Sequence, residues 1–162
     1  MNASLVAAFA NDPVLRHLFP DDATYPRYAT AFFGHLFDKR VHQGTIWTIG
    51  HGASVAMWDA PVARHGPLDD GLAAQLPAEA LARVNAYDQA LHAALPSSPF
   101  WYLGVLGTHP EHTGRRWGHA LMTAGLRRAA VIELTDPLSA LEVEQAGDLA
   151  EHLLLQSVLD LD

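Results

Sequence analysis

Residues 100–122 read FWYLGVLGTHPEHTGRRWGHALM. The run from Phe100 to Gly107 is almost wholly apolar and is bounded by turn-forming residues, which is typical of a central strand buried on both faces. From Trp117 onward, apolar residues recur at helical intervals. The stretch therefore predicts a strand, a glycine-containing turn and a helix in direct succession.

The turn in this stretch has the features of an anion-binding site. The first backbone N–H groups of a helix have no partner within it, and the helix dipole attracts negative charge to that end. Gly114 and Gly118 leave room for a ligand to approach the backbone. Arg115 and Arg116 each disfavour a helix start by about a few tenths of a kcal/mol, unless a phosphorylated ligand supplies negative charge. The alternative is a surface turn with solvated arginines.

Periodicity and turn signals divide the rest of the chain into helices and strands. Asp12 and Pro13 predict a helix start, as the N-cap and the first helical residue. The order of elements predicts a mixed α/β domain, in which the last strands could pair in parallel through helical crossovers. The expected helices span residues 3–9, 14–19, 25–41, 78–95, 117–130 and 147–158. The expected strands span residues 45–49, 53–59, 100–107 and 137–143, with a loop over 60–78.

Length and composition limit the classes of protein to consider. At 162 residues the chain is expected to form one domain, residues 1–162. Its net charge of −8 argues against a nucleic-acid-binding protein, which needs cations to neutralise phosphates. The absence of cysteine excludes a thiolate nucleophile and weakly favours a reducing compartment. No apolar run has the length of a membrane span and the N-terminus lacks signal-peptide features, so we expect a cytoplasmic protein without membrane contact.

Residues 100–129 resemble the acetyl-CoA-binding core of the GNAT acetyltransferase superfamily. Roughly residues 3 to 150 resemble the branch that includes puromycin N-acetyltransferase. The resemblance implies an α/β (α+β) fold with a mixed, mostly antiparallel central sheet flanked by helices. It also implies an N-acetyltransferase that moves acetyl from acetyl-CoA, its co-substrate, to a primary amine of a small molecule, with no metal.

The resemblance also implies a cofactor site. The family's fourth strand, here residues 100–106, exposes backbone groups to pantetheine and the acetyl carbonyl. The Q/R-x-x-G-x-G/A pattern that cradles the pyrophosphate falls on Thr113, Arg116 and Gly118, of which Gly118 alone matches strictly. Because Arg116 keeps its N–H donor, we expect the cradle to persist if residue 116 has a negative φ. The implied cofactor-binding residues are Leu103, Val105, Leu106, Gly107, Thr113, Gly114, Arg115, Arg116, Trp117 and Gly118.

The C-terminal part departs from the family. The family pattern N-x-x-x-Y-E-R-x-G-F places Asp148 at the asparagine and His152 at the tyrosine. The chain ends at Asp162, which leaves room for little of the sixth strand and none of the seventh. We therefore expect a sheet that lacks its last strand or strands. Because an unpaired edge promotes aggregation, we also expect a homodimer that completes the sheet edge.

The implied reaction is direct attack of the amine on acetyl-CoA, assisted by a base and an acid. Glu142, or else Glu111, could assist deprotonation of the amine, and the alternative is a surface carboxylate. His152 could protonate the departing thiolate in place of the family's tyrosine, and the alternative is a surface histidine on a leucine-rich helix. The second function considered is a degenerate family member that binds CoA or another ligand without transferring acetyl, as a sensor or an assembly module.

Two further groups of residues could belong to a functional site or could have a purely structural role. His109, Glu111 and His112 lie in one short loop, but spacing places no further metal ligand beside them. Aromatic residues on strands could line a pocket for the acceptor or belong to the core. They are Trp47, Trp58, Trp101 and Tyr102.

Overall fold

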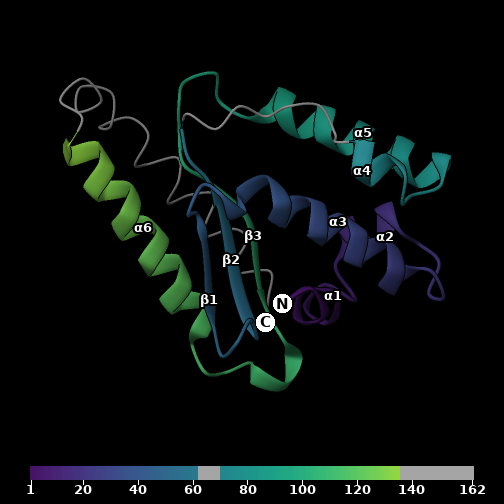
Figure 1. Cartoon of the computed structure of the whole chain (residues 1–162), viewed down its shortest axis with the longest axis horizontal. Helices are drawn as coiled ribbons and strands as arrows, with labels where there is room; N and C mark the ends of the chain where they lie inside the picture. Colours follow the sequence, from purple (N-terminus) through teal and green to yellow (C-terminus); the bar gives the residue numbers. More distant parts are fainter. Residues whose placement is uncertain (62–69, 136–162) are drawn as a thin grey trace. The chain divides into compact units, whose positions relative to one another are not determined.

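The computed structural model of the chain describes residues 1–61 and 70–135 (Figure 1). Met1–Gly125 form one compact unit, which is the part described in detail below. The expected strand over residues 137–143 and the expected helix over 147–158 lie outside the described residues. Glu142 and His152 lie there too.

The helices follow the periodicity of the sequence. The N-cap prediction for Asp12 is confirmed, because its Oδ1 accepts a hydrogen bond of 2.9 Å from the backbone N–H of Leu15. The predicted loop over residues 60–78 contains one short helix, α4, which the sequence analysis missed. The helices are α1 (Asn2–Ala8), α2 (Pro13–Leu18), α3 (Tyr25–Val41), α4 (Asp70–Ala73), α5 (Ala78–Ala94) and α6 (Trp117–Thr135).

The described strands form an antiparallel sheet in the order β1–β2–β3. Their bounds are β1 (Ile46–Ile49), β2 (Ser54–Asp59) and β3 (Tyr102–Thr108). The expected strands over residues 45–49 and 53–59 are confirmed and pair as a hairpin: β1 and β2 join through Gly50, His51 and Gly52, which all have a positive φ. The burial predicted for a central strand over residues 100–107 is wrong, because β3 is mostly half-buried. Among the described strands, β2 lies between β1 and β3 and is buried throughout.

The sheet separates two hydrophobic clusters. On one face, Val55 and Met57 of β2 pack with Val105 of β3 and with residues from α1 to α5. On the other face, Ala56 and Trp58 pack with Leu121 of α6. Because successive side chains of a strand point to opposite faces, β2 supplies both clusters and is buried along its whole length. The fold is therefore a mixed α/β arrangement of helices around an antiparallel sheet, as the sequence predicted.

Two glycines of α6 allow a controlled test of how this helix packs on Trp58. A Cβ at Gly125 would lie 2.4 Å from Cε2 of Trp58, whereas a Cβ at Gly118 would have no protein atom nearer than 3.8 Å. We expect Gly125→Ala to lower the free energy of unfolding by about 1–2 kcal/mol through overpacking. We expect Gly118→Ala to raise it by about 0.5 kcal/mol through helix propensity. Urea denaturation measures both changes, and equal effects would contradict the packing of α6 on Trp58.

Candidate functional site

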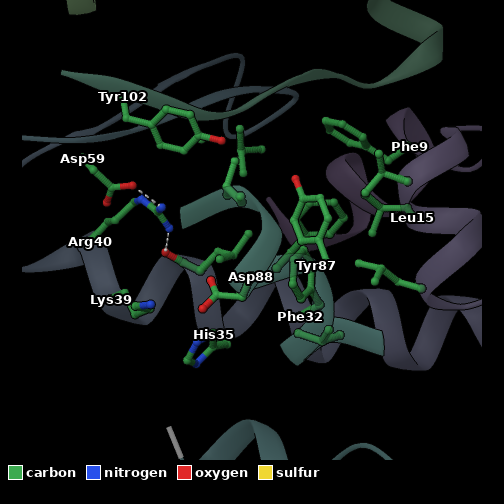
Figure 2. Close-up of a pocket in the computed structure, with 18 of the residues that line it drawn as sticks. Phe9, Leu15, Phe32, His35, Lys39, Arg40, Asp59, Tyr87, Asp88 and Tyr102 are labelled. Atoms are coloured by element: carbon green, nitrogen blue, oxygen red, sulfur yellow. Dashed lines mark hydrogen bonds and ion pairs between the residues drawn. The ribbon is translucent and has the colours of Figure 1, made fainter. Parts of the chain in front are cut away.

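A cavity of about 190 Å³ opens between α2, α3, α5 and β3 (Figure 2). Its walls are largely apolar, with Leu15 from α2, Phe32 and Leu36 from α3, and Leu91 from α5. A water molecule takes about 30 Å³ of liquid volume, and an apolar cavity of about 150 Å³ holds benzene. The cavity is therefore large enough for a small organic group.

A buried ion pair forms the polar end of this cavity. Arg40, on the last turn of α3, donates from Nη2 to Oδ2 of Asp59 at 2.5 Å, and both side chains are less than 10% exposed, at 7% and 8%. A second guanidinium nitrogen, Nη1, donates to the carbonyl of Leu36 at 2.8 Å. The Nε of Arg40 is buried and has no acceptor among the described residues. One N–H group of the guanidinium is therefore buried without a partner among the described residues.

The backbone of β3 is shaped to admit this arginine. The β2–β3 register pairs Met57 with Val105 and Trp58 with Leu103, so Gly104 is the extra residue of a β-bulge. A Cβ at Gly104 would lie 3.0 Å from Nη2 of Arg40. The glycine therefore allows the guanidinium to lie against the strand at the position of the bulge.

Two tyrosines face the same cavity. Burial raises the pKa of Tyr102 to about 12, helped by Tyr87 and Asp59 and opposed by Arg40. Burial also raises the pKa of Tyr87, helped by the carboxylates of Asp12 and Asp88. Neither hydroxyl has a hydrogen-bond partner in the described part of the chain. Figure 2 shows the Tyr102 hydroxyl directed toward the side of the cavity on which Tyr87 lies. Both groups are neutral at physiological pH and are free to hydrogen-bond a ligand.

The opposite end of β3 leads into the loop that the sequence singled out. A short 3₁₀ helix, η1 (Pro110–His112), follows β3, and α6 then begins at Trp117. Gly114 has a φ of 75° and Arg116 a φ of 59°. The condition under which the cradle is expected to persist, a negative φ at residue 116, is therefore not met, because the chain turns from the loop into α6 through a left-handed residue.

This turn leaves a row of unpaired backbone donors. The N–H groups of Arg116, Trp117, Gly118 and His119 have no acceptor among residues 1–61 and 70–135, while the carbonyl of Arg116 accepts from Ala120. Left-handed residues beside right-handed ones orient successive N–H groups toward one concave point, the conformation that binds anions. The predicted donors therefore lie together at the start of α6, but in a backbone conformation that does not meet the condition under which the cradle is expected to persist.

The aromatic side chain at this turn has a structural role. A Cβ at Gly50 would lie 2.8 Å from the Trp117 indole, so the indole packs on the β1–β2 turn. The ring of His112 lies 5.3 Å from that of Trp117, and the guanidinium of Arg115 lies 5.2 Å from it. Trp117 therefore anchors the start of α6, while Arg115 and Arg116 are exposed at its rim.

The remaining predicted cofactor residues are mostly held by packing. The side chains of Leu103 and Leu106 pack against the Trp58 cluster, and Val105 belongs to the opposite cluster. A Cβ at Gly107 would lie 2.8 Å from Leu5 and from Phe9 of the N-terminal segment. The hydroxyl of Thr113 donates to the carbonyl of Pro110 at 2.9 Å. Any contact of these residues with a cofactor would therefore use the backbone.

The other predicted chemical groups lie apart from the cavity. Oε2 of Glu111 is 4.0 Å from Nδ1 of His109, and the Glu111 side chain is 81% exposed in the loop after β3. In the described ranges, no three histidine or acidic side chains are arranged to bind a metal ion. Of the aromatic residues considered for an acceptor pocket, Tyr102 alone lines the cavity. The others, Trp47, Trp58 and Trp101, belong to the cluster on the opposite face.

Sequence reasoning missed the polar end of the cavity. In the sequence, Arg40 falls near the end of the predicted helix over residues 25–41, and Asp59 is the last residue of the predicted strand over 53–59. Their meeting depends on how α3 packs on β2, which no local pattern encodes. A comparison with known protein families does not assign this chain to a family, because no family model matches it. In the part of the chain that the structure covers, no helix combines the length and hydropathy that crossing a membrane requires.

The buried pair of Arg40 and Asp59 predicts a large loss of stability when one partner is removed. Asp59→Asn leaves the buried Arg40 without a counter-charge, so we expect a loss of about 3–5 kcal/mol in the free energy of unfolding. Asp22→Asn is the matched control, because Asp22 pairs with Arg16 at the surface, where such a pair contributes about 0–1 kcal/mol. Urea denaturation measures both variants. A loss at Asp59 no larger than that at Asp22 would contradict the buried pair.

The raised pKa of Tyr102 predicts how the stability of the protein depends on pH. The folded pKa of this tyrosine is raised from 10.0 to about 12, so between these values the unfolded chain loses a proton that the folded chain keeps. This part of the stability is complete below pH 10 and is lost as the pH rises toward 12. Denaturation should be measured at several pH values between 10 and 12. Across this window, the free energy of unfolding of Tyr102→Phe should fall by about 2 kcal/mol less than that of the unsubstituted protein. Parallel losses would contradict the raised pKa.

Proposed function

We propose that this protein is a GNAT-type N-acyltransferase that moves acetyl from acetyl-CoA to the primary amine of a small molecule by direct attack. The observation that carries the proposal is the position of β3. One end of this strand forms the wall of the Tyr102–Arg40 cavity, and the other leads to the unpaired N–H groups at the start of α6. A strand rises about 3.3 Å per residue, so Gly104 and Thr108 are about 13 Å apart. That separation suits an elongated cofactor with a diphosphate at one end and a reactive group at the other.

The diphosphate of the cofactor would bind at the turn before α6. The N–H groups of residues 116–119 would donate to its oxygens, aided by the helix dipole. Arg115 and Arg116 would add positive charge at the rim. Gly114, in the same turn, supports this placement, because no atom of the described residues lies within 4 Å of the position that its Cβ would take.

The acetyl transfer would take place toward the cavity end of β3. The amine nitrogen forms a bond to the acetyl carbon, the carbon–sulfur bond breaks, and the thiolate of CoA gains a proton as the amine loses one. Glu142 and His152 stay predictions for the base and the acid, because they lie outside the described residues. The exposed Glu111 remains a second candidate for the base. The expected homodimer and cytoplasmic location likewise stay predictions.

Calorimetry and a thiol assay test the proposal together. Acetyl-CoA and CoA should both bind, and an amine panel with acetyl-CoA should release free thiol. Gly118→Ala should weaken acetyl-CoA binding about tenfold, which corresponds to about 1.4 kcal/mol, because a methyl group blocks approach to the donors. Thr123→Ala, further along α6, is the control and should leave binding unchanged.

The outcomes separate the two functions considered. Binding with no thiol release over many amines would favour the protein that binds CoA without transferring acetyl. Failure of both acetyl-CoA and CoA to bind would overturn both functions.

A further inference from the structure

We infer that the cavity between α3, α5 and β3 holds the acyl group of the CoA thioester, and that the protein takes apolar acyl groups larger than acetyl, up to the size of hexanoyl or phenylacetyl. This inference deepens the function proposed above and rests on it. The argument depends on where the cavity meets β3, on the charges and apolar groups that line it, and on its volume.

The first step concerns the position of the cavity. It begins at the bulge of β3, where Gly104 is the extra residue and lines the cavity together with Tyr102 and Val105. The extra residue of a bulge takes no part in the regular pairing of its strand. The proposed function places the thioester toward this end of β3. An acyl group bound there would extend from the strand into the cavity.

The second step concerns charge. Figure 2 shows Arg40, Asp59 and Tyr102 together on one side of the cavity. The guanidinium and the carboxylate neutralise each other there, and the raised pKa of Tyr102 keeps its hydroxyl neutral at physiological pH. A charged ligand group would lose its hydration at this end without gaining a free counter-charge, which is costly. An uncharged acyl group meets no such cost.

The third step separates an acyl group from an acceptor amine as the occupant. Burial raises the pKa of Tyr87, helped by the carboxylates of Asp12 and Asp88, which therefore lie near this tyrosine and also line the cavity. An ammonium group in the cavity would be attracted to these carboxylates, at the start of α2 and on α5. The thioester lies at β3, so this orientation turns the amine nitrogen away from the carbon that it must attack.

The last step concerns size. The walls enclose about 190 Å³, and an apolar cavity of about 150 Å³ holds benzene. An acetyl group has one methyl group beyond its carbonyl and would leave most of this volume empty. A hexanoyl chain or a phenylacetyl ring fills it, and each methylene group buried there strengthens binding. The apolar side chains that would contact it are Leu15, Phe32, Leu36, Val84 and Leu91.

Calorimetry with a series of thioesters tests the inference. The titrants are CoA, acetyl-CoA, hexanoyl-CoA, phenylacetyl-CoA and decanoyl-CoA, each added without any amine. We expect hexanoyl-CoA and phenylacetyl-CoA to bind at least tenfold more tightly than acetyl-CoA, because the cavity buries their apolar groups. Decanoyl-CoA should bind no more tightly than hexanoyl-CoA, because its chain exceeds the cavity. An affinity that kept rising through decanoyl-CoA would indicate a general apolar surface and overturn the inference.

Variants locate the acyl group. Leu91→Trp fills the cavity, so it should bring the affinity for hexanoyl-CoA down to that for acetyl-CoA and leave CoA binding unchanged. Leu126→Trp is the matched control, because Leu126 is 45% exposed on α6, and it should keep the preference for hexanoyl-CoA. Leu91→Ala enlarges the cavity and should shift the tightest binding toward decanoyl-CoA. Thermal unfolding confirms that each variant folds, and Leu91→Ala keeps the test decisive if Leu91→Trp does not fold.

The outcomes separate this inference from the function on which it rests. Failure of both CoA and acetyl-CoA to bind would overturn the acyltransferase and this inference with it. Binding of both, with no gain for the larger acyl groups, would overturn this inference and leave the acetyltransferase. A gain that persists in Leu91→Trp would place the acyl group outside the cavity and overturn the inference. Binding of free 2-phenylethylamine that Leu91→Trp abolishes would make the cavity an acceptor site and overturn it as well.

Discussion

The ion pair between Arg40 and Asp59 is the constraint around which this end of the fold is arranged. A buried guanidinium requires a counter-charge, which the Asp59 carboxylate supplies, and the Leu36 carbonyl accepts from a second nitrogen. Asp59 ends β2, Leu36 lies one turn back on α3, and Gly104 leaves the space that the guanidinium needs. Helix α3 and strands β2 and β3 are therefore held in one arrangement by a single side chain.

The bulge at Gly104 couples this arrangement to the rest of the sheet. By adding one residue to β3, it places Gly104 and Val105 on the cavity side while Leu103 and Leu106 still pack against Trp58. The same strand then continues to the turn before α6. A change in how β3 pairs with β2 would therefore reach the cavity and the row of backbone donors together.

Local patterns predicted the elements, and long-range packing determined the site. Helical spacing and the Asp12–Pro13 cap predicted the described helices other than α4, and turn signals separated the strands over residues 45–49 and 53–59. The partner of Arg40 lies 19 residues away and depends on tertiary packing. The three tryptophans considered for the acceptor pocket belong to the cluster on the opposite face of the sheet. Strand pairing and the bulge decide on which face a side chain lies.

The conformation of Arg116 indicates that contacts with other parts of the fold determine the backbone of the turn before α6. A left-handed conformation costs a residue with a Cβ about 1–2 kcal/mol, so an isolated turn would place glycine there. Here the next residue, Trp117, is fixed against Gly50 of the hairpin, which sets where α6 must begin. The packing of one indole thus helps to fix the backbone N–H groups at the start of α6 in their orientation. In this chain, tertiary packing supports a left-handed conformation at a side chain that also carries positive charge.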